Sequence, residues 1–250
     1  MSLDRRGWLR GAGASLGAAL LAGCDRIATD PGVVKVLSSA EVLNRRIQRV
    51  FGREALAREF TRADITDTFK ANGTIFPPDA DYKAHAAAGF ANWVLTVDGL
   101  VETPLALTLG QVRALPARTQ ITRHDCVEGW SCIGEWTGAR MSAIAEMAGL
   151  RPEAKHFVLY CADTLGGSKY YETLDRVDIF HPQTILAYAM NGEPLTIPHG
   201  APLRLRAERY LGYKQAKYVL RLQAVDRFDN IAGGQGGYWE DQGYDRYGGI

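Results

Sequence analysis

Short apolar runs typical of β-strands alternate with short helical patterns along this chain of 250 residues, and no segment is repeated. This alternation is the strongest constraint on the fold, because a helical bundle would need longer stretches of helical period. Strands are predicted at 120–126, 155–162, 203–206 and 218–225, and helices at 141–148 and 182–190. The glycine-rich loops of Rossmann and P-loop proteins are not found. We therefore expect the α+β class, with mixed sheets and surrounding helices.

Three longer segments complete this expectation. Apolar residues at steps of three and four predict an amphipathic helix over 40–60. The stretch 64–88 has no clear period and is expected to be a long ordered loop. The tail 233–250 is rich in glycine and tyrosine and is expected to wrap the surface without regular structure.

Two local signals add detail between these segments. Alternation around Asp98 and Gly99 indicates a tight β-hairpin, since this dipeptide is typical of two-residue turns. Thr108 is expected to cap a short helix that ends before Pro116.

The composition excludes several classes of protein. The chain is 46% hydrophobic and 23% charged, which is ordinary for a globular domain. A formal net charge of +1 gives no reason to expect a nucleic-acid partner. Four cysteines are too few for a fold built on disulfides, so each cysteine has to be judged by its surroundings.

The first 23 residues have the pattern of an export signal. Arg5 and Arg6 precede a stretch of Gly, Ala and Leu that is too short to cross a bilayer as a helix. The paired arginines resemble the bacterial twin-arginine signal, and an ordinary secretory signal is the alternative. Leu21 to Cys24 resembles a lipobox, which implies lipidation of Cys24 and a membrane-tethered mature chain. Because the twin-arginine route carries folded proteins, a cofactor inserted before export is expected.

Chemistry is expected where the strand at 120–126 ends. Cys126 follows Arg123 and His124, two side chains that can favour its thiolate. A cysteine in this setting is suited to bind a soft metal or to act as a nucleophile. A buried structural cysteine and a disulfide with Cys132 are the alternatives. Zinc is not expected, because no C-x-x-C or H-E-x-x-H motif is present.

A second group of polar residues lies between Leu186 and Lys217. A proline-bounded loop carries His199 and Gly200, and the strand that follows presents Arg204. Arg204 and Lys217 are suited to hold a phosphate, the arginine as a bidentate fork and the lysine as a point charge. Surface charge on strands is the alternative.

These two segments together resemble the sulfite-oxidase superfamily of molybdopterin enzymes. The likeness is carried by Cys126 to Ser131 (CVEGWS) and by 186–217, in that order, and it extends over about 64–226. The chain is most similar to the periplasmic methionine sulfoxide reductase catalytic subunits and their small relatives. The resemblance implies a sulfite-oxidase-type molybdopterin-binding fold. We do not expect the immunoglobulin-like carboxy-terminal domain of sulfite oxidases, and we expect the protein to be a monomer.

The resemblance also implies site residues. The molybdenum ligand of the family matches Cys126. Its molybdopterin-binding positions match Asn72, Cys161, His199, Arg204, Gln215, Ala216 and Lys217. Candidate pocket residues near the cysteine are His124, Glu128, Trp130 and Tyr170. Two positions depart from the family, since His199 replaces the Asn of the reductases and Cys161 stands where a Thr is expected.

A substrate class follows from what is missing. The arginines that bind sulfate in sulfite oxidases align with Ala71 and Ser131, so sulfite is a poor candidate. We expect a periplasmic molybdopterin-dependent oxidoreductase that performs two-electron oxygen-atom transfer and reduces a small S-oxide such as methionine sulfoxide. An electron-transfer partner, either a haem membrane protein or a cytochrome, is also expected. The alternatives are a sulfite dehydrogenase-like oxidase, a metal-free thiol oxidoreductase and a non-enzymatic exported lipoprotein.

The expected domain organisation has three parts. These are the export signal at 1–23, a linker with the amphipathic helix at 24–63, and the molybdopterin-binding domain at 64–250.

Overall fold

The computed structural model describes residues 30–51 and 54–249. Contacts between residues define two compact units, 1–53 and 54–250, and each is described by itself. The predicted export signal and Cys24 lie outside the described residues. Within the described ranges, no helix combines the length and the apolar character needed to span a bilayer.

The first described element is α2 (Pro31–Phe51), which is displaced from the helix predicted over 40–60. It begins earlier because Asp30 caps it, accepting hydrogen bonds from the backbone N–H groups of Gly32 (2.8 Å) and Val33 (3.1 Å). Proline in the first helical position also suits a helix start. The prediction followed apolar spacing alone and missed both signals. The described residues after α2 that fall in the predicted range are not helical.

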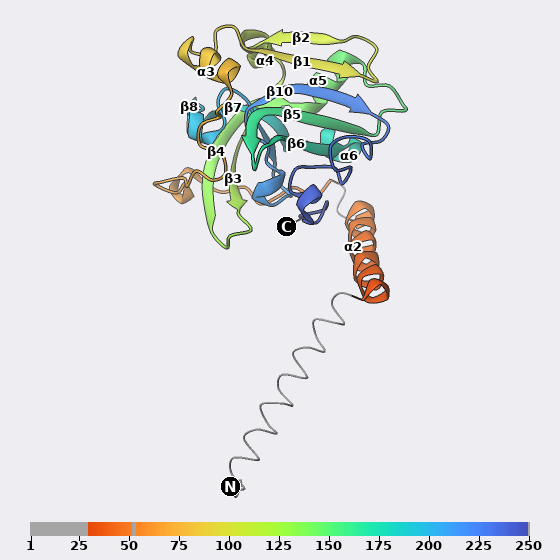
Figure 1. Ribbon diagram of the computed structural model, residues 1–250. Helices are drawn as coiled ribbons and strands as arrows, with labels where there is room; N and C mark the ends of the chain where they lie inside the picture. Colours follow the sequence, from red (N-terminus) through yellow and green to blue (C-terminus); the bar gives the residue numbers. More distant parts are fainter. Residues whose placement is uncertain (1–29, 52–53, 250) are drawn as a thin grey trace, which may run out of the picture. The chain divides into compact units, whose positions relative to one another are not determined.

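Five strands form the first sheet, in the order β2-β1-β10-β5-β6 (Figure 1). They are β1 (Val94–Gly99), β2 (Leu105–Thr108), β5 (His156–Leu165), β6 (Ser168–Asp175) and β10 (Val219–Val225). β1 and β10 are parallel, and the other neighbours in this sheet are antiparallel. The strands predicted at 155–162 and 218–225 are confirmed as β5 and β10.

The hairpin predicted around Asp98 is wider than expected. β1 ends at Gly99, and residues 100–104 separate it from β2, so no two-residue turn joins the strands. The Asp98 carboxylate instead accepts two hydrogen bonds from the guanidinium of Arg221 on β10, at 2.8 and 2.9 Å. Gly99 has φ +84°, and a side chain there would collide with the carbonyl oxygen of Ala224. The glycine therefore permits close pairing of β1 with β10.

The second sheet has the order β3-β4-β7-β8, and β9 also pairs with β7. Its strands are β3 (Ala117–Asp125), β4 (Ser131–Arg140), β7 (Thr184–Met190), β8 (Glu193–Pro194) and β9 (Arg204–Ala207). The helix predicted at 182–190 is wrong, because this segment is β7. Its Leu, Ala and Met residues favour helices, but β7 pairs with both β4 and β9, and this tertiary pairing overrides the local preference. The strands predicted at 120–126 and 203–206 are confirmed as β3 and β9.

Four short α-helices complete the second unit. They are α3 (Ala80–Ala87), α4 (Leu109–Ala114), α5 (Met141–Ala148) and α6 (Arg176–Ile179). α5 has the predicted bounds, and Thr108 caps α4 as predicted. α3 interrupts the segment 64–88 that was expected to be a loop. Asp79 caps α3 by accepting from two backbone N–H groups of its first turn, at 3.0 and 3.1 Å, and the alanine-rich helix has no apolar stripe to predict it by.

The main hydrophobic core contains residues of α5, β1, β5, β9 and β10. A second, smaller cluster centres on Trp136 of β4, which is fully buried against Ile185 and Ala187 of β7. After β10, the only helix in the described tail is the 3-10 helix η4 (Glu240–Gln242), as expected for an irregular wrap. The tail returns to the first sheet, where the Tyr238 N–H donates to the Tyr171 carbonyl at 3.0 Å.

Candidate active site

Cys126 lies directly after β3, in the loop that joins β3 to β4. Two backbone hydrogen bonds close this loop. The Cys126 N–H donates to the Trp130 carbonyl at 2.9 Å, and the Gly129 N–H donates to the Cys126 carbonyl at 3.0 Å. Gly129 has φ +84°, a left-handed conformation that favours glycine. The Asn72 side-chain amide donates to Cys126 Sγ at 3.3 Å, so the structure brings this predicted pair together.

A cavity of about 510 Å³ opens beside Cys126. The predicted site residues that line it are Asn72, His124, Cys126, Glu128, Trp130, Tyr170, His199, Arg204, Gln215 and Lys217. These residues come from distant parts of the sequence, so the cavity is formed by the tertiary fold. It has two ends. The cysteine end is formed by the β3–β4 loop, and the cationic end is formed by Arg204 and Lys217.

Two predicted cofactor contacts, Cys161 and Ala216, do not line the cavity and instead lie in the main core. Asp163, two residues after Cys161 on β5, does line the cavity, and the pairing of β5 with β6 shifts register between Tyr160 and Thr164. Burial raises the pKa of the Asp163 carboxyl to about 6.

The cationic end holds two buried charges, and no carboxylate of the described residues contacts either of them directly. Arg204 Nη1 donates to the carbonyl of His199 at 3.0 Å, and its buried Nε has no hydrogen-bonding partner in the described chain. Lys217 Nζ donates to the carbonyls of Asn72 (2.8 Å), Thr74 (2.5 Å) and Pro198 (2.9 Å). Burial lowers the pKa of Arg204 to about 9 and that of Lys217 to about 7. This end of the cavity therefore favours an anion.

The loop residues around these cations hold them in place. His199 Nδ1 lies 2.8 Å from Thr196 Oγ1, and Nε2 lies 3.1 Å from the Phe69 carbonyl oxygen, so both ring nitrogens have protein partners. Gly200 has φ +102°, and a Cβ there would lie 3.0 Å from the Lys217 side chain.

Gln215 supports the same loop through its side chain. Its amide donates to the carbonyls of Ala207 (3.1 Å) and Tyr210 (3.0 Å), and its Oε1 accepts from the Ala207 N–H at 3.1 Å. The side chain thus fastens the segment that precedes Lys217 to the end of β9.

The cysteine end has paired charges. Trp130 Nε1 donates to the Glu128 carboxylate at 2.9 Å, and this bond holds the pKa of Glu128 below its ordinary value. Lys70 Nζ lies 3.7 Å from Glu128 and 4.8 Å from the Trp130 ring centroid. The Tyr170 hydroxyl donates to the Tyr213 carbonyl. Glu128, Trp130 and Tyr170 thus bond to other protein groups.

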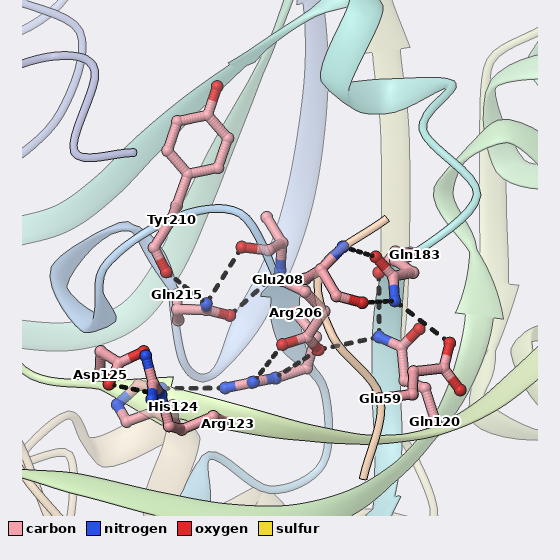
Figure 2. A network of polar contacts seen from close by, with 12 residues as sticks. Glu59, Gln120, Arg123, His124, Asp125, Gln183, Arg206, Glu208, Tyr210 and Gln215 are labelled. Atoms are coloured by element: carbon pink, nitrogen blue, oxygen red, sulfur yellow. Dashed lines mark hydrogen bonds and ion pairs between the residues drawn. The ribbon is translucent and has the colours of Figure 1, made fainter. Parts of the chain in front are cut away.

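His124 lies two residues before Cys126 on the buried face of β3. Its Nδ1 lies 2.9 Å from Arg206 Nη1, and Arg206 forms a fully buried ion pair with Glu208, as Figure 2 shows. Burial and the positive charges of nearby arginines hold the pKa of His124 well below its ordinary value.

Three aromatic residues of the tail line the cavity and were not predicted: Tyr238, Trp239 and Tyr244. Tyr238 stacks on Tyr170 with ring centroids 5.5 Å apart, and Trp239 and Tyr244 are 5.0 Å apart. The only signal in the sequence was the unusual aromatic content of the glycine-rich tail. The tail therefore forms part of the wall as well as wrapping the surface.

The disulfide considered between Cys126 and Cys132 is not formed, since both thiols are free. Cys132 lies on β4 opposite His124 and is buried. Among the described residues, no group of three or more His, Cys, Asp or Glu side chains is arranged to hold a metal ion. Ligation by several protein side chains, as in a structural zinc site, is therefore not a property of this part of the chain.

Residues 82–230 match the family model described as the oxidoreductase molybdopterin binding domain, and this chain belongs to that family. It is thus a molybdopterin-binding oxidoreductase with the predicted α+β fold. A protein of Azospira oryzae, provisionally named protein-methionine-sulfoxide reductase subunit YedZ1, is 36% identical over 98% of this chain and 87% of its own length. The protein-methionine-sulfoxide reductase catalytic subunit MsrP of Campylobacter jejuni is 31% identical over 53% of this chain. The match spans 48% of that relative, about half of its length.

A solved structure shows the same fold. The sulfane dehydrogenase SoxCD of Paracoccus pantotrophus matches 70% of this chain and 46% of that chain, with a TM-score of 0.50 and 22% identity. At this identity the similarity concerns the fold alone.

The residues of the cavity fit the cofactor of the family. A buried thiol at one end is a suitable soft ligand for molybdenum, and two buried cations at the other end suit the phosphate of molybdopterin. The unpartnered Nε of Arg204 is the most direct sign, because a buried donor is rarely left without an acceptor. The acceptor is therefore expected to come from a bound group.

Proposed function

We propose that this chain reduces a small S-oxide such as methionine sulfoxide, with molybdopterin bound in the cavity. In this proposal Cys126 is the one protein ligand to molybdenum. Arg204 and Lys217 bind the phosphate, and Asn72 and His199 hold the loops that enclose the pterin. The names of the Azospira and Campylobacter relatives, which refer to protein-methionine-sulfoxide reductases, support the choice of substrate.

The choice of a neutral S-oxide as substrate rests on the charge balance of the cysteine end. Ala71 lines the cavity without a charge, and the Ser131 hydroxyl donates to Asp125 at 2.5 Å. Lys70, a cation that lines the cavity, is paired with Glu128. Sulfite carries one to two negative charges near neutral pH, so its binding calls for positively charged donors that are not already paired. A neutral S-oxide needs one or two hydrogen-bond donors beside an apolar wall.

The proposed reaction breaks the S–O bond of the substrate. Two electrons and two protons convert the S-oxide to a thioether and release the oxygen atom as water. The bound cofactor supplies the two-electron chemistry. The chain itself binds and orients the substrate, and the aromatic wall formed by Tyr238, Trp239 and Tyr244 limits access of water. The electrons come from a haem membrane protein or a cytochrome.

Activity with two substrates tests the proposal. Enzyme purified from a host that makes the cofactor should reduce methionine sulfoxide with a reduced viologen dye, and should oxidise sulfite slowly or not at all with ferricyanide. Molybdenum content measured on the same sample shows that the cofactor is present. Fast sulfite oxidation without sulfoxide reduction would instead identify a sulfite dehydrogenase-like oxidase.

We place the enzyme in the periplasm, exported by the twin-arginine route and tethered through Cys24. This rests on the Arg5-Arg6 pair and on the lipobox-like residues before Cys24. Replacing both arginines by lysine should leave the cofactor-loaded precursor in the cytoplasm, and Cys24→Ala should release the mature protein from membrane fractions. Normal export of the double-lysine variant would show that another route is used.

A further inference from the structure

Three of the candidate pocket residues that line the cavity have side chains able to donate a hydrogen bond to a substrate: His124, Trp130 and Tyr170. Trp130 already donates to Glu128, and Tyr170 already donates to the carbonyl of Tyr213. His124 differs from both, because among the described residues its only hydrogen-bonding contact is made through Nδ1. Its Nε2 lies beside Gly212, and both residues line the cavity.

The contact with Arg206 determines which nitrogen of His124 carries the proton. A guanidinium can only donate hydrogen bonds, and Arg206 Nη1 lies 2.9 Å from His124 Nδ1. Nδ1 must therefore act as the acceptor. The imidazole is then neutral, and its single proton is on Nε2, which lies beside Gly212, another residue that lines the cavity.

Arg206 is itself held in one orientation, as Figure 2 shows. Its Nε and Nη2 donate to the two carboxylate oxygens of Glu208, at 3.0 and 2.5 Å, and both side chains are fully buried. Glu208 also accepts from Gln120 Nε2 at 2.8 Å. The Arg206 guanidinium lies 4.4 Å from the centroid of the Trp136 ring. These contacts leave Nη1 directed at His124.

Gly212 provides the space that the donor needs. A Cβ at this position would lie 2.7 Å from His124 Nε2. Since Gly212 does not have a left-handed conformation, glycine is required here for space rather than for backbone geometry. The glycine at position 212 is thus explained by its close approach to His124.

We infer that the buried pair Arg206–Glu208 positions His124 as a neutral Nε2–H donor, and that this donor binds the oxygen atom of the S-oxide. The second half of the inference rests on the proposed function, and the first half does not. His124 contacts the substrate, whereas Arg206 and Glu208 are positioning residues that act through it. A neutral donor binds the oxygen without attracting an anionic substrate.

The tautomer can be measured without any turnover. The full chain, labelled with ¹⁵N-histidine, contains five histidines, and His124→Gln identifies the signal of His124. A long-range ¹H–¹⁵N correlation spectrum should show the Nε2–H tautomer for His124. The double variant Arg206→Met with Glu208→Leu removes both charges of the pair together, and it should give a mixture of tautomers. An Nδ1–H or doubly protonated pattern in the unmodified protein would overturn the inference.

A matched control uses the exposed pair Arg227–Asp229, which has the same spacing along the chain. Arg227→Met with Asp229→Leu should leave the His124 signal unchanged. If the double variant at 206 and 208 does not fold, Gly212→Ala replaces it. The added methyl group should displace the imidazole and shift the Nε2 resonance.

Substrate binding is tested on the oxidised, cofactor-loaded enzyme, which cannot turn over without an electron donor. Titration with methionine sulfoxide should shift the His124 Nε2 resonance and leave that of His181 in place. In turnover assays His124→Phe should raise KM about tenfold, and His124→Gln, which keeps a donor, should stay within about threefold. An unmoved resonance or an unchanged KM in His124→Phe would overturn the second half of the inference.

The two proposals fail in different ways. If the loaded enzyme reduces no S-oxide at all, the proposed function is wrong, while the spectrum of His124 still decides the tautomer. If the enzyme reduces S-oxides and His124 is in the Nδ1–H form, only this inference fails.

Discussion

Arg204 and Arg206 lie two residues apart on β9 and contact the same ring, with their guanidinium carbons 4.8 and 4.4 Å from the centroid of Trp136. Their charges are balanced differently. Arg206 forms a bidentate ion pair with Glu208, whereas the direct hydrogen bonds of Arg204 go to backbone carbonyls. The cationic end of the cavity therefore keeps unbalanced positive charge, and the cysteine end does not.

This difference shows how one strand can serve two kinds of ligand. Alternate residues of a strand share a face, so β9 presents both arginines to the same side, where Arg204 lines the cavity and Arg206 contacts the lining residue His124. Glu208 balances the charge of Arg206, and the charge of Arg204 is left for a bound anion. An anionic cofactor group and a neutral substrate can then be bound in the same cavity without competing for the same cation.

Removal of the cysteine thiol should have the largest effect. Cys126→Ser should lower activity by more than about a hundredfold, because it replaces the proposed metal ligand. It should also alter or abolish the Mo(V) paramagnetic signal. Cys132→Ser, which changes the neighbouring buried thiol, should keep both. A normal signal in the Cys126 variant would contradict its assignment as the ligand.

At the cationic end, Lys217→Gln should mainly affect cofactor content. The variant keeps a hydrogen-bond donor and loses the charge, so the molybdenum content of purified protein should fall by about tenfold. Lys83→Gln, at an exposed position on α3, is the control and should have normal content. Full molybdenum occupancy in Lys217→Gln would show that this cation does not hold the cofactor.

The unbalanced positive charge at the cationic end should also affect the stability of the cofactor-free protein. Burial lowers the pKa of Lys217 to about 7 in the folded state, against an ordinary value of 10.5. Between these values the unfolded chain binds a proton that the folded chain does not, so the free energy of unfolding should rise with pH. The slope from pH 7 to about 8.5 is at most about 1.4 kcal/mol per pH unit.

Denaturant titrations at several pH values measure this slope. Lys217→Met should remove most of it, because the substituted side chain does not titrate. Asp163 contributes in a different range, between its ordinary pKa of 3.8 and its raised pKa of about 6. There the folded chain binds a proton that the unfolded chain does not, so the free energy of unfolding falls as the pH rises. An equal slope in Lys217→Met would assign the effect to another group.

Much of the fold and of the site could be predicted, because the informative residues are close together in the sequence. Cys126 and its loop form one short segment, and Arg204 and Lys217 belong to another. Strands with clear apolar runs were also predicted close to their observed bounds. Where β7 was misassigned, the local composition favoured a helix, and only its pairing with two neighbouring strands makes it a strand.

The parts that could not be predicted depend on contacts between distant residues. His124 and Arg206 are 82 positions apart, and no spacing rule relates them. Asp163 lines the cavity and Cys161 does not, although both lie on β5, and the register shift of β5 against β6 in this stretch leaves no mark on the sequence pattern. Tyr238 of the tail contacts Tyr170 only after the tail has folded back across the first sheet.

The smallest expected effect comes from adding charge to the neutral end. Ala71 lines the cavity, and the sequence resemblance matches it to a sulfate-binding arginine of sulfite oxidases, so Ala71→Arg tests whether neutrality determines the choice of substrate. The new cation can form charge-assisted hydrogen bonds with sulfite. Sulfite oxidation should then rise severalfold, while KM for methionine sulfoxide increases no more than about threefold. Ala71→Gln, which adds bulk without charge, is the control and should not gain sulfite oxidation. An equal gain of sulfite oxidation in the two variants would show that the shape of the cavity, and not its charge, determines the choice of substrate.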